Sequence, residues 1–426
     1  MKRLNLKTWL LAASAAVAFT GCDLMKEDLE DCPTGLYVNF VYDYNIQRSD
    51  MFKDHVGAVM LYVYDDQNRM VAKKTVGDGF FKAYGRYVHI SEEELQPGTY
   101  SLLAVAMQKN FSDALAAPGA KYRVAGDAVG DQRSQLSITL DHSPAPALAP
   151  SVVELPGTRA TTLVPTVAPL DTLWHTLSTI VTPASQHPLQ LAPAMLTPAA
   201  TEYIWQRDGS IKSNGVSTVT VVKGEPTYAT MSLIRDTKHL NISLRGVNAD
   251  PKENQVKAED FTVEIIDVNS RLDADNNLTA TTDSIAYHPY QAWTTTFAAT
   301  DTLLNESVAH YDLMFNRLLY RNASVTNDQY AILDPTAVAS SKNAVLLIRK
   351  ASDKSIVFGI NLPYVLSSGR TYQERYYHYQ EYLDREYDYR LQFLIKGGKV
   401  ETIEYYMGAE VHIIPWAVRT QHEVLE

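Results

Sequence analysis

Hydrophobic and polar residues alternate with a period of two along several stretches of the chain. Residues 36–42 carry Leu, Val, Phe and Tyr at every second position, as in a strand with one buried face. Further strands of the first half are expected at 56–64, 69–76 and 99–107. Asp65-Asp66-Gln67-Asn68 is a turn-forming cluster between the first two of these, and Ser91 and Glu94 have the spacing of a capping box that starts one helical turn. The first half is therefore expected to consist mainly of β-strands.

The alternation returns in the second half of the chain. Strands are expected at 217–222, 227–233, 240–244, 261–268, 344–350, 356–362, 389–395, 400–406 and 411–418. Ala351-Ser352-Asp353-Lys354 and Gly397-Gly398 supply hairpin turns. Residues 371–385, which are rich in tyrosine, form the one longer helix that we expect. No repeat with a period of about 20–50 residues occurs, which argues against a solenoid.

Residues 143–200 differ from the parts on either side. Ten prolines fall there among Ala, Leu, Thr and Ser. So many prolines disfavour a central strand, and long loops in a polyproline-like conformation are expected instead. A domain boundary is expected near Lys223-Gly224-Glu225-Pro226. The predicted fold class is all-β, with two tandem β-sandwich domains and short helices: 36–223, with 143–200 as an insertion, and 224–426.

The N-terminus has the pattern of an export signal. Three positive charges precede an uncharged run from Trp9 to Phe19, which is too short to span about 30 Å of hydrocarbon. The following Thr20-Gly21-Cys22 resembles a bacterial lipobox, and this resemblance implies that residues 1–21 are removed and that Cys22 carries lipid. Three acyl chains would hold such a protein in its membrane. The alternative is a plain secreted protein that is cleaved elsewhere.

Short motifs suggest export to the cell surface and glycosylation. Residues 22–35 form an acidic segment without hydrophobic periodicity, and we expect this segment to act as a tether. Within it, Lys26-Glu27-Asp28 resembles a signal that sends lipoproteins to the outer surface in Bacteroidetes-type bacteria, although a solvated tether explains the same residues. Three Asp-Ser/Thr-apolar triplets resemble O-glycosylation acceptors of these bacteria, and their hydroxyl residues are Thr172, Ser284 and Thr302.

Composition narrows the choice of partners. The formal net charge is −11 and the chain has no basic stripe, which argues against a nucleic-acid partner. The chain has two cysteines, so Cys32 has no partner for a disulfide if Cys22 is lipidated. Tyrosine is in excess, with 26 residues against 11 phenylalanines. Such amphipathic aromatic residues suit partly wet sheets and binding surfaces.

Sequence motifs for catalysis are missing, so neither an enzyme nor a cofactor or metal is expected. There is no HExxH, CxxC, P-loop, G-x-S-x-G or Rossmann glycine pattern. Asp273-Ala274-Asp275-Asn276-Asn277 is similar to the start of a calcium loop but lacks its glycine and its final glutamate, so an Asx-turn is favoured. Glu381, Asp384 and Glu386 are the densest carboxylate group. For them a surface pair of Glu381 with Arg385 is favoured over acid–base chemistry.

Several motifs together resemble a known family. Leu95-Gln96-Pro97-Gly98-Thr99-Tyr100 resembles the turn that leads into a strand of transthyretin-like β-sandwiches. Longer-range similarity to the FimB-type fimbrial anchor lipoproteins of Bacteroidetes is carried by Asp31-Cys32-Pro33, Val38-Asn39-Phe40, Leu61-Tyr62-Val63-Tyr64-Asp65, Phe261-Thr262-Val263-Glu264-Ile265, Asp275-Asn276-Asn277-Leu278, the decapeptide from Gln380 to Tyr389, and Val411-His412-Ile413-Ile414-Pro415-Trp416. The order and spacing of these short pieces carry the resemblance, while residues 143–200 match poorly.

The resemblance implies two transthyretin-like sandwiches in a non-enzymatic lipoprotein of the outer membrane. Such a protein would anchor or cap the base of a surface fimbria and contact fimbrial subunits. Strand addition would supply the contact, with main-chain hydrogen bonds giving affinity and alternating side-chain pockets giving specificity. The alternative is a surface lipoprotein that binds glycan or host protein without any fimbria.

Overall fold

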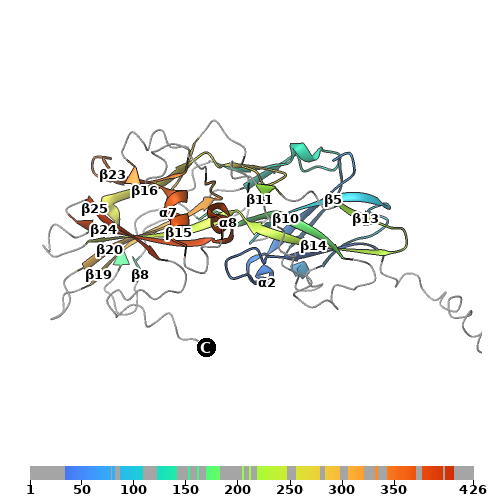
Figure 1. The fold of residues 1–426 in the computed structure, drawn as a ribbon, viewed down its shortest axis with the longest axis horizontal. Helices are drawn as coiled ribbons and strands as arrows, with labels where there is room; N and C mark the ends of the chain where they lie inside the picture. Colours follow the sequence, from blue (N-terminus) through green and yellow to red (C-terminus); the bar gives the residue numbers. More distant parts are fainter. Residues whose placement is uncertain are drawn as a thin grey trace, which may run out of the picture.

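The computed structural model describes residues 34–77, 79–81, 87–108, 122–141, 152–153, 161–162, 169–182, 204–205, 211–212, 218–246, 256–278, 284–297, 306–320, 332–333, 343–370, 377–396 and 399–406. Strands dominate these residues, so the all-β prediction is confirmed. Figure 1 shows most elements of the first half at one end of the long axis and those of the second half at the other, where the short strand β8 (Val152–Val153) also lies. Within the described ranges, no helix has the length and apolar character needed to cross a membrane.

The first half is built on one eight-stranded sheet. Its strands are β1 (Gly35–Val41), β2 (Ala58–Tyr64), β3 (Met70–Gly77), β4 (Tyr87–Ile90), β5 (Gly98–Met107), β10 (Leu173–Thr182), β13 (Thr218–Val221) and β14 (Pro226–Arg235). They follow the order β3-β2-β5-β10-β14-β1-β4, and β13 pairs with the N-terminal end of β5. Leu36, Val38 and Phe40 of β1 all point into one hydrophobic core, as the period of two requires.

The second half is a sandwich of two five-stranded sheets. One sheet has the order β19 (Gln291–Phe297), β20 (Glu306–Asn316), β15 (Thr237–Gly246), β24 (Asp388–Lys396), β25 (Lys399–Tyr406). The other has the order β18 (Ile285–Tyr287), β16 (Phe261–Asp267), β22 (Val345–Lys350), β23 (Ile356–Asn361), β21 (Ile332–Leu333). Leu240 and Ile242 of β15 share one core with Val263 and Ile265 of β16.

Each half contains one parallel pair of strands. β1 runs parallel to β14, with Gly35 opposite Pro226, and β15 runs parallel to β24, with His239 opposite Asp388. In both halves the first strand therefore lies beside a strand from the end of that half. Parallel neighbours need a long connection, which the intervening strands supply. The two halves thus share a parallel pairing that the sequence periodicity does not show.

The two halves also share a sheet and a core. β6 (Tyr122–Ala125) and β7 (Ser137–Leu140) come from the first half, and β7 pairs on its other edge with β17 (Arg271–Asp273) of the second. One hydrophobic cluster contains Tyr62 and Leu103 together with Leu240 and Leu391. Burying apolar surface of both halves in one core favours their fixed association.

The helices are short. Those with described bounds are α2 (Phe52–His55), α7 (Leu362–Ser368) and α8 (Tyr379–Arg385), with 3₁₀ turns η2 (Arg133–Gln135) and η4 (Ala258–Asp260). Of the helix predicted over 371–385, α8 forms the last seven residues, Tyr377 and His378 are not helical, and 371–376 lie outside the described residues. The side chain of His378 accepts a hydrogen bond from the N–H of Gln380 at the start of α8. The helix α7 was not predicted. Asn361 caps it by accepting the N–H of Tyr364 at 3.2 Å.

Two sequence expectations about domain organisation need correction. Within 143–200, residues of β10 form a central strand that pairs with β14 and β5, because the prolines of this segment leave the stretch between Pro169 and Pro183 free. The strand β14 lies beyond the expected boundary at 223/224 and yet pairs with β1 and β10. Sheet pairing therefore divides the halves at Asp236. Four further strands are β8 (Val152–Val153), β9 (Thr161–Thr162), β11 (Ile204–Trp205) and β12 (Ile211–Lys212).

Candidate functional site

A single residue connects the last strand of the first half to the first strand of the second half. β14 ends at Arg235 and β15 begins at Thr237, so only Asp236 connects them. Asp236 is fully buried. Its N–H donates to the carbonyl of Leu173 at 2.8 Å, and its Oδ1 accepts a hydrogen bond from Nδ2 of Asn276 at 2.9 Å. This connection leaves no flexible linker between the strands of the two halves.

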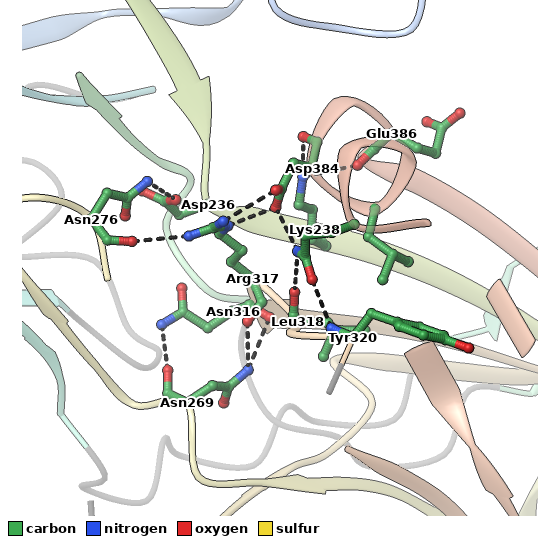
Figure 2. Close-up of polar contacts among 12 residues, drawn as sticks. Asp236, Lys238, Asn269, Asn276, Asn316, Arg317, Leu318, Tyr320, Asp384 and Glu386 are labelled. Carbon is green, nitrogen blue, oxygen red and sulfur yellow. Dashed lines mark hydrogen bonds and ion pairs between the residues drawn. The ribbon is translucent and has the colours of Figure 1, made fainter. Parts of the chain in front are cut away.

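Lys238 ties this connection to the helix α8. Its Nζ donates to the carbonyl of Asp384 at 2.7 Å and to that of Glu386 at 2.9 Å (Figure 2). The last turn of a helix leaves its carbonyl groups without intrahelical partners. A buried ammonium group here supplies the missing donors and fixes the end of α8 against the start of β15.

Arg317, which follows β20, binds the side chain of Asp384 in a bidentate pair. Its Nε lies 2.6 Å from Oδ1 of Asp384 and its Nη2 lies 3.1 Å from Oδ2, while its Nη1 donates to the carbonyl of Asn276 at 2.9 Å. Both side chains are buried, with exposures of 1% and 0%. The planar guanidinium fork matches a carboxylate, which makes such pairs strong and geometrically specific. We call Asp236, Lys238, Arg317 and Asp384 the junction cluster.

Amide side chains connect the junction cluster to neighbouring loops of the second half. Nδ2 of Asn269 donates to the carbonyls of Asn316 and Arg317, and Nδ2 of Asn316 donates back to the carbonyl of Asn269 at 2.8 Å. Gln380 of α8 donates to the carbonyl of Leu318 and accepts the N–H of Tyr320 (Figure 2). The loops after β16 and β20 are thereby fixed to α8.

The charges of the junction cluster compensate one another. Burial raises the pKa of Asp236 and lowers the pKa of Lys238. Burial alone would also lower the pKa of Arg317, but the carboxylate of Asp384 outweighs it and raises that pKa. Two acids and two bases thus share one buried space, where an unpaired charge would be costly. Because all four residues are at most 1% exposed, the cluster can fix geometry but offers no group to a substrate.

Stacked arginines join the halves around the junction cluster. The guanidinium carbon of Arg235 lies 5.5 Å from the ring centre of Trp174 and 4.3 Å from that of Tyr387. That of Arg385 lies 4.1 Å from the ring centre of Tyr44 in the first half. Such cation–π contacts are stronger when they are desolvated, so they add to the fixed geometry of the two halves.

A histidine close to the junction makes stability depend on pH. Nδ1 of His239 lies 2.6 Å from Oδ1 of Asp388, and its Nε2 lies 3.7 Å from Oδ1 of Asp312. Burial alone would lower the pKa of His239, but the two carboxylates outweigh it and raise that pKa to about 9. Protonated His239 therefore stabilises the fold fully below its unfolded pKa of about 6.5, and this contribution is lost as the pH rises through 9.

We expect His239→Gln to remove this alkaline loss of stability, an effect on the order of 1 kcal/mol for a partly exposed pair. Urea denaturation at several pH values between neutrality and the alkaline range measures it. The exposed His288, replaced by glutamine, is the control. An unchanged alkaline loss in His239→Gln would contradict the role of this histidine.

The residues predicted from sequence motifs are distributed as follows. Cys22, Lys26, Glu27, Asp28 and Thr302 lie outside the described residues. Ser284 is exposed just before β18. Thr172 is buried and its Oγ1 donates to Oε1 of Gln108 at 3.1 Å, so a glycan there would have to replace a hydrogen bond of the folded chain.

The two candidate chemical groups form local contacts. The carboxylate of Asp273 accepts the N–H groups of Asp275 and Asn277, each at 2.9 Å, as an Asx-turn does. Glu381 pairs with Arg385 at 2.9 Å, the i,i+4 contact that was favoured. No group of three His, Cys, Asp or Glu residues within the described ranges is placed to hold a metal ion.

Sequence reasoning did not find most of the junction cluster. Asp384 was assigned to a surface carboxylate group, and Asp236, Lys238 and Arg317 were not considered. A signal was present, because Arg317 stands in the stretch Met314-Phe315-Asn316-Arg317-Leu318-Leu319. A charged residue inside an apolar stretch is rarely buried without a partner. The partners come from distant parts of the chain, and no local pattern identifies them.

Solved structures share this fold over most of the chain. A candidate adhesin from Bacteroides thetaiotaomicron has a TM-score of 0.59 and 18% identity, and the match covers 88% of this chain and 97% of that one. A candidate polysaccharide-binding protein from the same species has a TM-score of 0.54 and 18% identity, with 88% and 98% covered. A candidate adhesin from Bacteroides ovatus has a TM-score of 0.54 and 21% identity, with 89% and 94% covered.

At these identities the likeness shows the fold alone. No curated protein sequence is significantly similar to the chain. The family model of fimbrillin-A associated anchor proteins Mfa1 and Mfa2 matches residues 29–191 and 214–422. That match includes both halves, the junction cluster and most of the segment 143–200. The chain therefore belongs to the Mfa2 family of fimbrillin-A associated anchor proteins.

Proposed function

We propose that this chain is a lipoprotein of the outer membrane that anchors the base of a surface fimbria. The family match over both halves carries the proposal, because it is a family of fimbrial anchors. The lipobox-like Cys22 and the acidic tether before Gly35 supply a route to the membrane. Lys26-Glu27-Asp28 would direct the protein to the cell surface, and the exposed Ser284 is the most accessible of the described glycosylation candidates.

Strand addition to a fimbrial subunit needs a free sheet edge, and the described edges differ. In the first half, β4 has four residues, and β3 carries Lys73 and Lys74, each in an ion pair. Edge lysines and short edge strands disfavour added strands. In the second half, β18 and β21 have three and two residues, and β19 lies close to β9. The other end strand of the sheet that contains β19 is β25, which has eight residues. We therefore propose β25 as the edge that pairs with a fimbrial subunit.

Two neighbouring proline substitutions test this edge. Successive residues of a strand direct their N–H groups to opposite sides, so of Thr402→Pro and Ile403→Pro, one removes a donor toward β24 and the other a donor toward the free edge. The variant that loses the donor toward β24 should destabilise the hairpin of β24 and β25. The variant that loses the donor toward the free edge should fold normally, since proline is tolerated on an edge. It should capture fimbrial subunits from cell extracts at least about tenfold less well, because ladder hydrogen bonds supply the affinity.

Pull-down with purified protein and thermal melting of both variants measure these effects. If both variants fold and both capture fimbrial subunits as well as the unsubstituted protein does, β25 is not the edge that pairs with the subunit. Attachment is tested separately by deleting the chain, after which fimbriae should be found in the medium rather than on cells.

A second candidate function is binding of glycan without a fimbria. It is favoured by the shared fold with a candidate polysaccharide-binding protein and by the many tyrosines. A glycan array separates the two functions. Specific glycan binding together with unchanged fimbrial attachment in the deletion strain would favour this second candidate.

A further inference from the structure

A ladder of arginine and tyrosine side chains lies at the junction, outside the junction cluster. Arg385 lies between Tyr44 and Tyr377, at 4.1 Å and 5.0 Å from their ring centres. The guanidinium carbon of Arg48 is 5.1 Å from the ring centre of Tyr377. Next to them, Arg370 lies 4.0 Å from the ring centre of Tyr379, which stacks on Tyr320. Tyr44 and Arg48 belong to the first half and the others to the second, so docking of the halves creates this arginine–tyrosine ladder.

Two arginines of the ladder have no acidic partner within the described ranges. Arg385 is neutralised by Glu381, whereas Arg48 and Arg370 form no ion pair there. Instead, Nε of Arg48 donates to the hydroxyl of Tyr377, and Nη1 of Arg370 donates to the carbonyl of the same residue, each at 2.5 Å. Both arginines therefore converge on Tyr377, Arg48 at its hydroxyl and Arg370 at its backbone carbonyl. Nε of Arg370 is buried without a hydrogen-bond partner.

The carboxylates on the neighbouring loop are engaged elsewhere. Asp43 accepts the hydroxyl of Ser232 at 2.8 Å. Asp50 accepts the backbone N–H groups of Tyr42 and Phe52, each at 3.0 Å. Asp43 therefore binds β14, and Asp50 binds the backbone at both ends of its own loop. Arg48, which is exposed, keeps N–H groups that face solvent.

The geometry favours a carboxylate as the ligand. A guanidinium group that is held by a ring and a hydrogen bond loses little freedom on binding, and its planar fork matches a carboxylate in bidentate fashion. Sugar rings usually bind on an open aromatic face. The ring of Tyr379 already contacts Tyr320 and Arg370, which disfavours a sugar ring there. The chain as a whole carries a net charge of −11, so its overall charge would not attract an acidic ligand. Such a ligand would have to bind through these local arginine contacts.

We propose that Arg48 and Arg370 form a docking site for an acidic peptide segment of a partner protein. The proposal rests on the proposed function in so far as the partner is a fimbrial protein. The site is built from elements other than the edge strand β25, and so would give a second contact to the same assembly. It exists only when the two halves are docked, because Arg48 and Arg370 come from different halves.

A fluorescein-labelled octaglutamate peptide is the probe, and octaglutamine is the neutral control. Fluorescence anisotropy with the purified full chain should show saturable binding of octaglutamate that is lost at about 0.5 M salt, where charges are strongly screened. Arg48→Glu should weaken binding at least about tenfold, the effect of losing charge-assisted hydrogen bonds. Arg370→Glu should act in the same direction. Arg69→Glu is the matched control, because Arg69 is exposed on the β2–β3 turn.

Thermal melting shows whether each variant is folded, and the exposed Arg48 makes its variant the decisive one. The proposal is overturned if octaglutamate does not bind, or if Arg69→Glu weakens binding as much as Arg48→Glu. It is also overturned if only dextran sulfate binds in an Arg48-dependent way, since the ligand would then be an anionic polysaccharide. A strain that attaches its fimbriae normally without this chain would contradict the anchor function and would leave the peptide result unaffected.

Discussion

Replacing Arg317 with methionine is expected to lower the free energy of unfolding by about 3–5 kcal/mol, because the carboxylate of Asp384 would stay buried without its partner. The pair is bidentate and its side chains are at most 1% exposed. Its loss would also free the carbonyl of Asn276. Equilibrium denaturation in urea measures the change, which is large against a typical total stability of about 5–15 kcal/mol.

Two further variants distinguish the buried charge from a general effect of mutation. Arg123→Met removes the pair with Asp141, in which the arginine side chain is 56% exposed, and should cost no more than about 1 kcal/mol. Arg317→Met with Asp384→Leu removes both charges and should recover much of the loss, since Asp236 and Lys238 remain as one acid and one base. A loss in Arg317→Met no larger than in Arg123→Met would show that the buried pair with Asp384 contributes no more to stability than an exposed pair.

Replacing Cys22 with alanine is expected to release the protein from the membrane and the fimbriae from the cell. In the proposed function, the lipobox-like Cys22 is the point of attachment, and its acyl chains would hold the protein in the membrane. Three chains bind far more firmly than the single chain that gives only marginal anchoring. The membrane-bound fraction should fall at least about tenfold, as measured by fractionation and immunoblotting, and fimbriae should be recovered from the medium.

Cys32→Ala is the matched control for Cys22→Ala. It removes the other cysteine of the chain and leaves the lipobox intact, so the protein and its fimbriae should stay on the cell. Retention of the Cys22→Ala protein in the membrane, with fimbriae attached, would contradict both the lipid anchor and the proposed function. Release in both variants would point to a role of the cysteines other than lipidation.

The alternation of hydrophobic and polar residues predicted the strands better than their arrangement. The strands expected at 36–42, 56–64, 69–76 and 99–107 agree with β1, β2, β3 and β5 within a few residues, because each has one face in a core. The strand β10 was missed, because the prolines around it dominate the composition of 143–200 although none falls inside the strand. The parallel pairs could not be predicted, because periodicity does not determine which strand becomes a neighbour.

The junction cluster shows the same limit for polar residues. The i,i+4 pair of Glu381 and Arg385 was predictable, because helix geometry brings the two together. Asp384 lies between them in the sequence and yet turns inward to Arg317, 67 residues away. Only the packing of α8 against β14 and β15 decides which carboxylate is exposed and which is buried.

The parallel pairing of β1 and β14 has a mechanical consequence. Tension between lipid on Cys22 and a partner on the second half would enter at Gly35, the first residue of β1, and leave through Asp236 after the last residue of β14. Because the two strands run in the same direction from Gly35 and Pro226, such tension pulls them apart along their length. All hydrogen bonds between Gly35 and Val41 then share the load at once, in shear, instead of opening one after another. Since forced unfolding is governed by the rate of unfolding, this geometry favours a long-lived attachment under load.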